Sequence, residues 1–159
     1  MEMRIMRYEG ERTDFINLLL LADESRHMID RYIDRGEMYI LEDECIVKGE
    51  CLVTDEGGGI LEIKNIAVLP QYSRMGYGRA MIDYLSSVYS GAFSILQAGT
   101  GDSPLTIPFY EKCGFKRSHV IRNFFTDNYD HPIFECGRRL VDMVYLKMEL
   151  REKEMKIEK

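Results

Sequence analysis

The sequence predicts an α/β domain with a mixed, mostly antiparallel central sheet of about six to seven strands, flanked by about four helices. A buried-strand pattern from Ile60 to Leu69 runs through a polar, glycine-bearing turn into an amphipathic helix, which is typical of a strand–helix crossover. Strand-like runs lie on both sides of this unit, and neither a repeat nor a linker interrupts the 159 residues. We therefore predict a single domain at residues 1–150 and a charged tail at residues 151–159.

The first half of the chain alternates short strands with two helices. Thr13 or Asp14 is the expected N-cap of the first helix, and Gly36 ends the second. The predicted elements are a strand at Arg4–Tyr8, helices to about Ala22 and over about Ser25–Arg35, and strands at Met38–Leu41, Ile46–Thr54 and Ile60–Leu69.

The second half begins with a helix over Tyr77–Tyr89 whose predicted apolar face is Met81, Tyr84, Leu85 and Val88. A short helix ends at Gly114. Pro108 would remove a hydrogen bond inside a longer helix, so regular helix is expected only from Thr106 or Ile107. The remaining predicted elements are strands at Phe93–Gln97, Lys116–Phe124 and Leu140–Leu150, with an irregular loop at Phe125–Arg139.

Two glycines flank Tyr77 at the start of the predicted helix. Backbone N–H groups of such a turn converge with the positive end of the helix dipole, which favours an anion and above all a diphosphate. A dinucleotide fingerprint requires Gly or Ala where Met81 stands, and the Gly-Lys-Ser/Thr of a P-loop is absent.

Two motifs resemble a known family. Gln71-x-x-Arg74-x-Gly76-x-Gly78, directly after Asn65-Ile66-Ala67-Val68-x-Pro70, is similar to the acetyl-coenzyme A signature of the GNAT N-acetyltransferase superfamily. The segment Phe109–Phe115 resembles the later motif of that family, in which a Tyr-x-x-x-Gly-Phe helix end lies beside the cofactor thiol. The motifs have the expected order and spacing, and the resemblance covers most of the chain.

The resemblance implies acetyl-coenzyme A (acetyl-CoA) as cofactor, with the pantetheine arm entering a gap between the strand before the turn and the strand after its helix. The segment from Arg74 to Arg79 would then wrap the pyrophosphate. The cofactor-binding residues expected on this basis are Ile66, Ala67, Val68, Arg74, Met75, Gly76, Tyr77, Gly78, Arg79, Ser103 and Tyr110.

The same resemblance gives two residues a catalytic role. The Val68 N–H would bind the thioester carbonyl and stabilise the oxyanion. Tyr110 matches the position of the general acid that protonates the departing sulfur, and the alternative is a core aromatic on a short helix.

The general base is less clearly marked. Glu62 shares side-chain parity with Lys64, Ile66 and Val68 on the predicted strand, and could point toward the acceptor cleft. The alternative is a half-exposed carboxylate paired with a lysine across the sheet. Lys64 itself stands near the place of a glutamate base in other family members. Further candidates are an ordered water, Glu50, Asp127, His131 and Glu135.

The segment Asn123–Glu135 is dense in aromatic residues and carboxylates. Loops of this length are often functional, so one hypothesis makes it part of the acceptor pocket. The other makes it an ordered loop that covers the edge of the sheet.

Composition narrows the function. The net charge of −6 disfavours nucleic acid and mildly favours a cationic acceptor. The sequence shows no membrane span and no signal-peptide pattern, and its four cysteines have neither disulfide nor zinc spacing, so a cytoplasmic monomer or homodimer without a metal is expected. The leading hypothesis is an N-acetyltransferase acting on a primary amine of a small molecule or peptide. The alternatives are acetylation of a protein N-terminus or lysine, and a non-catalytic acyl-CoA binding or sensing protein.

Overall fold

The computed structural model describes residues 3–150, which form a seven-stranded sheet with strand order β1-β2-β3-β4-β5-β9-β6. Neighbouring strands are antiparallel except for β4 and β5. The predicted fold class is therefore confirmed. The strands are β1 (Arg4–Arg7), β2 (Glu37–Asp43), β3 (Ile46–Asp55), β4 (Ile60–Val68), β5 (Ile95–Gly101), β6 (Lys116–Ile121) and β9 (Met143–Glu149), with a separate hairpin of β7 (Phe134–Glu135) and β8 (Arg138–Arg139).

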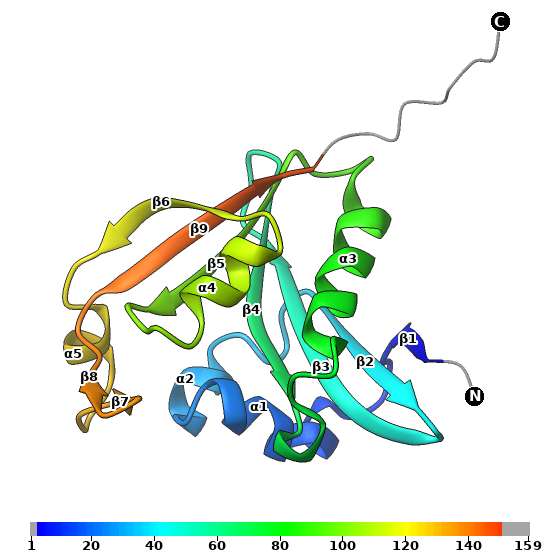
Figure 1. The fold of residues 1–159 in the computed structure, drawn as a ribbon, viewed down its shortest axis with the longest axis horizontal. Helices are drawn as coiled ribbons and strands as arrows, with labels where there is room; N and C mark the ends of the chain where they lie inside the picture. Colours follow the sequence, from blue (N-terminus) through cyan, green and yellow to red (C-terminus); the bar gives the residue numbers. More distant parts are fainter. Residues whose placement is uncertain (1–2, 151–159) are drawn as a thin grey trace, which may run out of the picture.

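Helices cover both faces of the sheet (Figure 1). Met81 of one helix and Tyr110 of another lie in the main core on one face, while Leu19 and Ile29 pack against Leu52 of β3 on the other. The helices are α1 (Ile16–Ala22), α2 (Arg26–Asp30), α3 (Tyr77–Tyr89), α4 (Ile107–Lys112) and α5 (Phe124–Asn128), with 3-10 turns at Arg12–Phe15 and Pro70–Tyr72. None of the helices within residues 3–150 is long and apolar enough to cross a membrane.

The parallel pair β4–β5 opens partway along its length. The two strands are paired only from Ile60–Ile63 on β4 to Ile95–Ala98 on β5. Beyond that point β4 remains paired with β3, and β5 remains paired with β9. The sheet therefore divides into two parts that diverge in Figure 1. A bulge at Lys64, where the pairing of β4 with β3 shifts by one residue, marks the point of separation.

The first two helices differ from their predicted bounds. The expected caps Thr13 and Asp14 lie inside a 3-10 turn, and α1 begins only at Ile16. The second helix does begin after Ser25, whose Oγ accepts a hydrogen bond from the Met28 N–H, but it ends at Asp30. Its predicted continuation forms turns instead, in which the N–H groups of Arg31 and Arg35 donate to carbonyls three residues earlier, and the Arg12 guanidinium donates to the carbonyls at the end of this segment.

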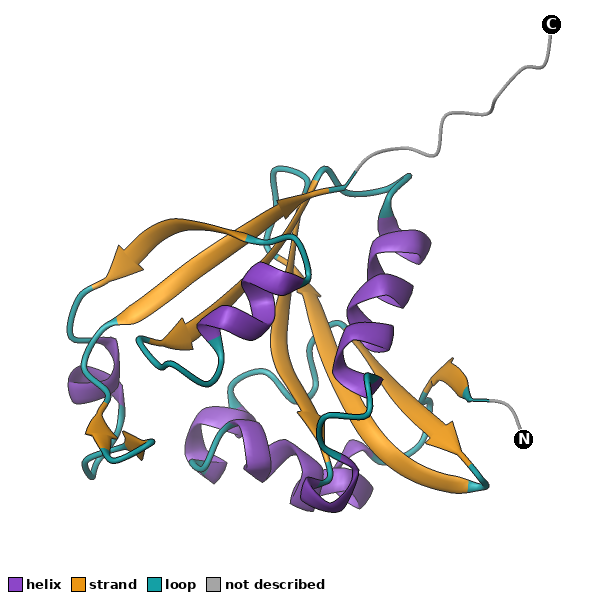
Figure 2. Cartoon of the chain, viewed as in Figure 1, coloured by secondary structure: helices purple, strands orange, loops and turns teal. Residues whose placement is uncertain are grey.

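The second half follows the prediction more closely. Helix α3 has the predicted bounds, although Val88 is 50% exposed and Ile82 takes its place on the buried face. Helix α4 begins at Ile107, so Pro108 falls in its first turn. The loop predicted at Phe125–Arg139 contains α5 and the β7–β8 hairpin (Figure 2). The predicted tail at residues 151–159 lies outside the described residues.

Candidate active site

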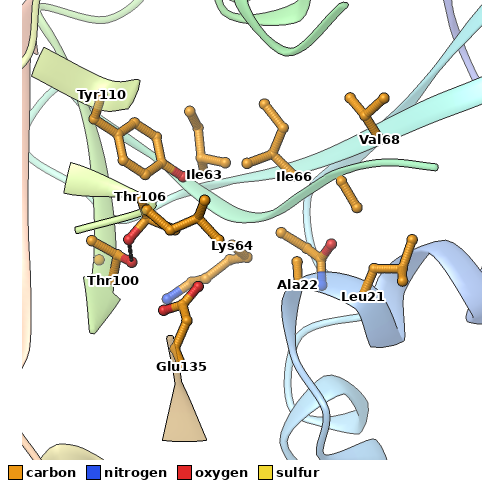
Figure 3. Close-up of a pocket in the computed structure, with 14 residues that line it drawn as sticks. Leu21, Ala22, Ile63, Lys64, Ile66, Val68, Thr100, Thr106, Tyr110 and Glu135 are labelled. Carbon is orange, nitrogen blue, oxygen red and sulfur yellow. Dashed lines mark hydrogen bonds between the residues drawn. The ribbon is translucent and has the colours of Figure 1, made fainter. Parts of the chain in front are cut away.

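A cavity of about 290 Å³ occupies the opening between β4 and β5. Its walls come from β4, the end of β5, α4 with the loop before it, the end of α1, and the β7–β8 hairpin. The titratable side chains that line it are Lys64, Tyr110 and Glu135, and they converge from three different elements (Figure 3). The full lining is Leu21, Ala22, Ile63, Lys64, Asn65, Ile66, Ala67, Val68, Gly99, Thr100, Leu105, Thr106, Tyr110 and Glu135.

The Val68 amide faces this opening. The next residue, Leu69, donates its N–H to the Lys48 carbonyl of β3 at 2.8 Å. Backbone N–H groups alternate in direction along a strand, so the Val68 N–H points away from β3 and toward the side that β5 has left. A donor is therefore aimed at the cavity from the position that the sequence predicts for an oxyanion contact.

Tyr110 is a core aromatic and also a lining residue. Its ring packs edge-on against Phe109 and Phe115, and the residue is only 6% exposed. Its hydroxyl points toward Ile63 and Ile66 in Figure 3, and no protein acceptor within residues 3–150 reaches it. Burial raises the pKa of Tyr110, so the hydroxyl keeps its proton at neutral pH. The side chain thus presents a free proton donor to the cavity.

The backbone of the turn before α3 has the conformation that an anion site requires. Arg74 and Gly76 have positive φ values of 62° and 86°, and Gly76 is the left-handed N-cap of α3 without a side-chain cap. No protein acceptor in the described chain satisfies the amides from Arg74 to Arg79, and a Cβ built on Gly76 would meet open space. These unpaired donors at a helix start fit the pyrophosphate of coenzyme A.

The side chains of this turn divide into two groups. Met75 is 61% exposed, and the guanidinium of the exposed Arg79 lies 4.0 Å from the Asp83 carboxylate. The Tyr77 side chain instead turns into the core, where its hydroxyl donates to Asp43 at 2.7 Å. Gly78 makes room for the Phe109 ring, which a Cβ there would meet at 3.0 Å. Tyr77 and Gly78 therefore contribute their backbone N–H groups, and not their side chains, to the candidate anion site.

Ser103 lies away from the cavity. It is 2% exposed, and its Oγ accepts a hydrogen bond from the Leu105 N–H at 3.1 Å. The hydroxyl thus stabilises the turn that leads to α4, and the structure does not bring it to the other predicted site residues.

The expected side-chain parity of Glu62 with Ile66 and Val68 is wrong, although Glu62 does line a second cavity beside Asp23, Lys64 and Tyr129. The extra residue at Lys64 reverses the alternation, so Glu62 lies on the face of Thr54 whereas Ile66 and Val68 lie on the opposite face. Glu62 is buried rather than half-exposed, and its lysine partner is on the same strand, with Lys64 Nζ at 2.6 Å. Its carboxylate also accepts hydrogen bonds from Gln97 and Tyr145. Three donors therefore occupy the carboxylate that the sequence suggests as a base.

Three of the other candidate bases also lie outside the cavity lining. Asp127 is exposed on α5. His131 is exposed, and its hydrogen bond with Asp130 raises its pKa and favours the protonated form. Glu50 is fully buried on β3, and no donor in the described chain reaches either of its oxygens. Burial raises the pKa of Glu50 to about 8. Of the candidates, only Glu135 lines the cavity.

Two adjoining cavities show residues that the sequence analysis missed. Both are lined by Asp23 at the end of α1, by Lys64 and by Tyr129. Asp23 accepts hydrogen bonds from the Tyr129 and Tyr32 hydroxyls at 2.9 and 3.1 Å. In the sequence, Asp23 follows a leucine run and reads only as the end of a helix. The segment from Asn123 to Glu135 contributes to the same walls, so it lies at the opening as the acceptor-pocket hypothesis requires.

An antiparallel sheet that opens at one parallel pair, with a glycine turn at the start of the crossover helix, defines an acyl-CoA N-acyltransferase fold. The family model described as "Acetyltransferase (GNAT) domain" matches residues 34–117. A curated relative from Bacillus subtilis, described as "Uncharacterized N-acetyltransferase YvbK", is 34% identical over 155 residues, covering 94% of this chain and all of the relative. The chain belongs to the GNAT acetyltransferase family, as its motifs predict.

Solved structures agree with this assignment. A GNAT family acetyltransferase from Elizabethkingia anophelis with acetyl-CoA bound has a TM-score of 0.87 at 33% identity, covering 93% of this chain and 98% of that one. A Bacillus subtilis acetyltransferase in complex with CoA has a TM-score of 0.85 at 32% identity, covering 94% and 99%. The protein is thus an acetyltransferase with close fold relatives over nearly its full length.

Proposed function

We propose that the protein transfers an acetyl group from acetyl-CoA to a primary amine of a small molecule or peptide, by direct attack in a ternary complex. The observation that supports this most strongly is that the Val68 amide and the protonated Tyr110 hydroxyl face one cavity at the opening of the sheet. Acetyl-CoA is the cofactor of the GNAT family and is present in the Elizabethkingia relative.

The chain offers separate regions to the two ends of coenzyme A. The amides from Arg74 to Arg79 would hold the pyrophosphate, with Arg74 adding a charged side chain beside them. Ile66, Ala67 and Val68 form the cavity wall along which the pantetheine arm would lie. When bound, acetyl-CoA supplies the acetyl group as a thioester.

Val68 and Tyr110 would act on opposite sides of that thioester. The Val68 N–H donates to the carbonyl oxygen as negative charge develops there, and loss of such a donor typically lowers kcat by a factor of about 100 to 1,000. The Tyr110 hydroxyl donates its proton to the departing sulfur, a role that contributes a factor of about 100 to 10,000. If Tyr110 only filled the core, a phenylalanine would serve equally well. A tyrosine hydroxyl that faces the cavity therefore favours an enzyme over a non-catalytic binding protein.

The acceptor class follows from how the opening is enclosed. The segment from α5 to β8 walls the acceptor side, and Ile133, Leu140 and Phe125 pack it into a small core of its own. A small amine or the end of a peptide fits a cavity of this kind better than a lysine within a folded protein surface.

Substitution of Tyr110 tests the proposal. A panel of primary amines, including putrescine, tyramine and a tripeptide with a free N-terminus, is assayed by thiol release from acetyl-CoA. Tyr110→Phe should lower turnover by about 100-fold or more and leave the thermal shift produced by coenzyme A unchanged. Tyr89→Phe removes a hydroxyl that bonds to Tyr39 at the far end of α3, and should keep wild-type turnover. An unchanged rate in Tyr110→Phe would leave this tyrosine a packing role only.

A further inference from the structure

Glu135 reaches the cavity from a hairpin that is held in place by its own packing. It is the second residue of β7, which pairs with β8 directly after α5. The Leu140 N–H donates to the Ile133 carbonyl at 2.8 Å, and both side chains pack on Phe125. The base of the hairpin is thus closed by a hydrogen bond and an apolar cluster, which fixes where Glu135 lies.

This carboxylate forms no ion pair with a described side chain, although Arg138 stands opposite it on β8. Lys64 lines the same wall, but its Nζ lies 2.6 Å from Glu62 and 3.5 Å from Glu56, so two carboxylates already balance its charge. No side chain within residues 3–150 forms a hydrogen bond or ion pair with Glu135. In Figure 3 its carboxylate points toward Lys64 and the interior of the cavity, across from Tyr110. The lining therefore carries an unpaired negative charge beside the predicted proton donor.

We propose that Glu135 binds the ammonium group of the acceptor and acts as its general base, and that the acceptor is therefore a cationic primary amine. This inference rests on the proposed function. The Glu135 carboxylate takes one proton from the ammonium, and the freed lone pair on nitrogen forms the C–N bond to the acetyl carbon. The C–S bond breaks with its electron pair on sulfur, which takes the Tyr110 proton. The second proton lost from nitrogen restores Tyr110 through solvent, and Glu135 releases the first, so that one proton is set free per turnover.

The adjoining cavity gives the rest of the acceptor a place. It shares Leu21, Ala22, Lys64, Thr100 and Glu135 with the first cavity and continues along Phe125 and Tyr129. The tail of the acceptor would follow this wall, where Phe125, Tyr129 and Ile133 offer apolar surface beside the polar side chains of Asp23 and Thr106. The charged and titratable groups around Glu135 are Lys64 from β4, Asp23 and Glu24 from the end of α1, Tyr110 from α4, Tyr129 from α5, and Arg138, its neighbour on β8.

The pH dependence of Glu135→Gln separates a base from a structural residue. With the best amine of the panel, kcat/KM should fall by about 100- to 10,000-fold at neutral pH. The variant can use only amine that is already neutral, and this fraction grows about tenfold per pH unit below the pKa of the amine. The ratio of wild-type to variant kcat/KM should therefore shrink steadily as the pH is raised. The thermal shift with coenzyme A should match that of the wild type, which shows that the variant is folded and binds its cofactor.

Asp127→Asn is the matched control, because Asp127 is an exposed carboxylate on the same segment and lines none of these cavities. It should keep both the wild-type rate and the wild-type pH profile. A Glu135→Gln deficit that stays constant with pH, or an unchanged rate, would overturn the assignment of Glu135 while leaving the acetyltransferase intact. A wild-type protein that acetylates no amine of the panel would instead contradict the proposed function itself.

Discussion

The stability of this protein should fall as the pH rises through the neutral range, because of one carboxylate. Glu50 is fully buried beside Ala67 on β4, and no donor in the described chain reaches its oxygens. Burial raises its pKa from 4.5 to about 8, so between these values the folded chain holds a proton that the unfolded chain has lost. Unfolding then releases a proton, and the free energy of unfolding decreases with pH across this window.

The size of the effect follows from the width of the window. Between the pKa of Glu50 in the unfolded chain and its pKa in the folded chain, each pH unit lowers the free energy of unfolding by about 1.36 kcal/mol. The full window from 4.5 to about 8 therefore corresponds to at most about 5 kcal/mol. Between pH 5 and pH 7 the expected loss is about 3 kcal/mol, or about 6–12 °C in Tm for a chain of this length. Above the upper value the contribution of Glu50 no longer changes.

Urea unfolding followed by circular dichroism at pH 5, 6 and 7 measures this loss. Glu50→Gln removes the titrating group, so its unfolding free energy should vary with pH by about 3 kcal/mol less than that of the wild type over this range, whatever its absolute stability. Glu111→Gln, an exposed carboxylate on α4, should keep the wild-type slope because it retains Glu50. Equal slopes in the wild type and Glu50→Gln would refute the reasoning.

Three further substitutions test the turn, the loop before α4 and the acceptor wall. Gly76→Ala places a Cβ at a φ of 86°, which costs about 1–2 kcal/mol in the left-handed region, and should weaken coenzyme A binding measured by isothermal titration. Ser103→Ala removes the acceptor of the Leu105 N–H and should lower the free energy of unfolding by about 1 kcal/mol. Its affinity for coenzyme A should equal that of the wild type. A large loss of this affinity would support the predicted contact between Ser103 and the cofactor. Tyr129→Phe removes a donor to Asp23, and should raise KM for the amine more than it lowers kcat; the opposite pattern would contradict a role in the acceptor wall.

Where neighbouring residues decide the structure, the prediction from sequence succeeded. Helix α3 has the predicted bounds, and the glycine turn before it has the left-handed residue that a helix N-terminus of this kind needs. Pro108 correctly placed the start of α4, since a proline fits only the first turn of a helix. The family motifs lie in these same segments, so the family was accessible from local pattern alone.

The acceptor side could not be predicted in this way. A single bulged residue, Lys64, places Glu62 on the opposite face of the strand from the one predicted. The alternation of side chains in the sequence does not indicate this bulge. Glu135 enters the cavity because Ile133 and Leu140 pack on Phe125. Glu50 lies on the same face of β3 as Leu52, where Leu19 and Ile29 from helices early in the chain pack on the sheet. The sequence by itself determined the helix, the turn and the family, because hydrogen bonds and side-chain periodicity within a few residues specify them. Only the tertiary structure decided which carboxylates meet the cavity, because that depends on strand register and on packing between residues far apart in the chain.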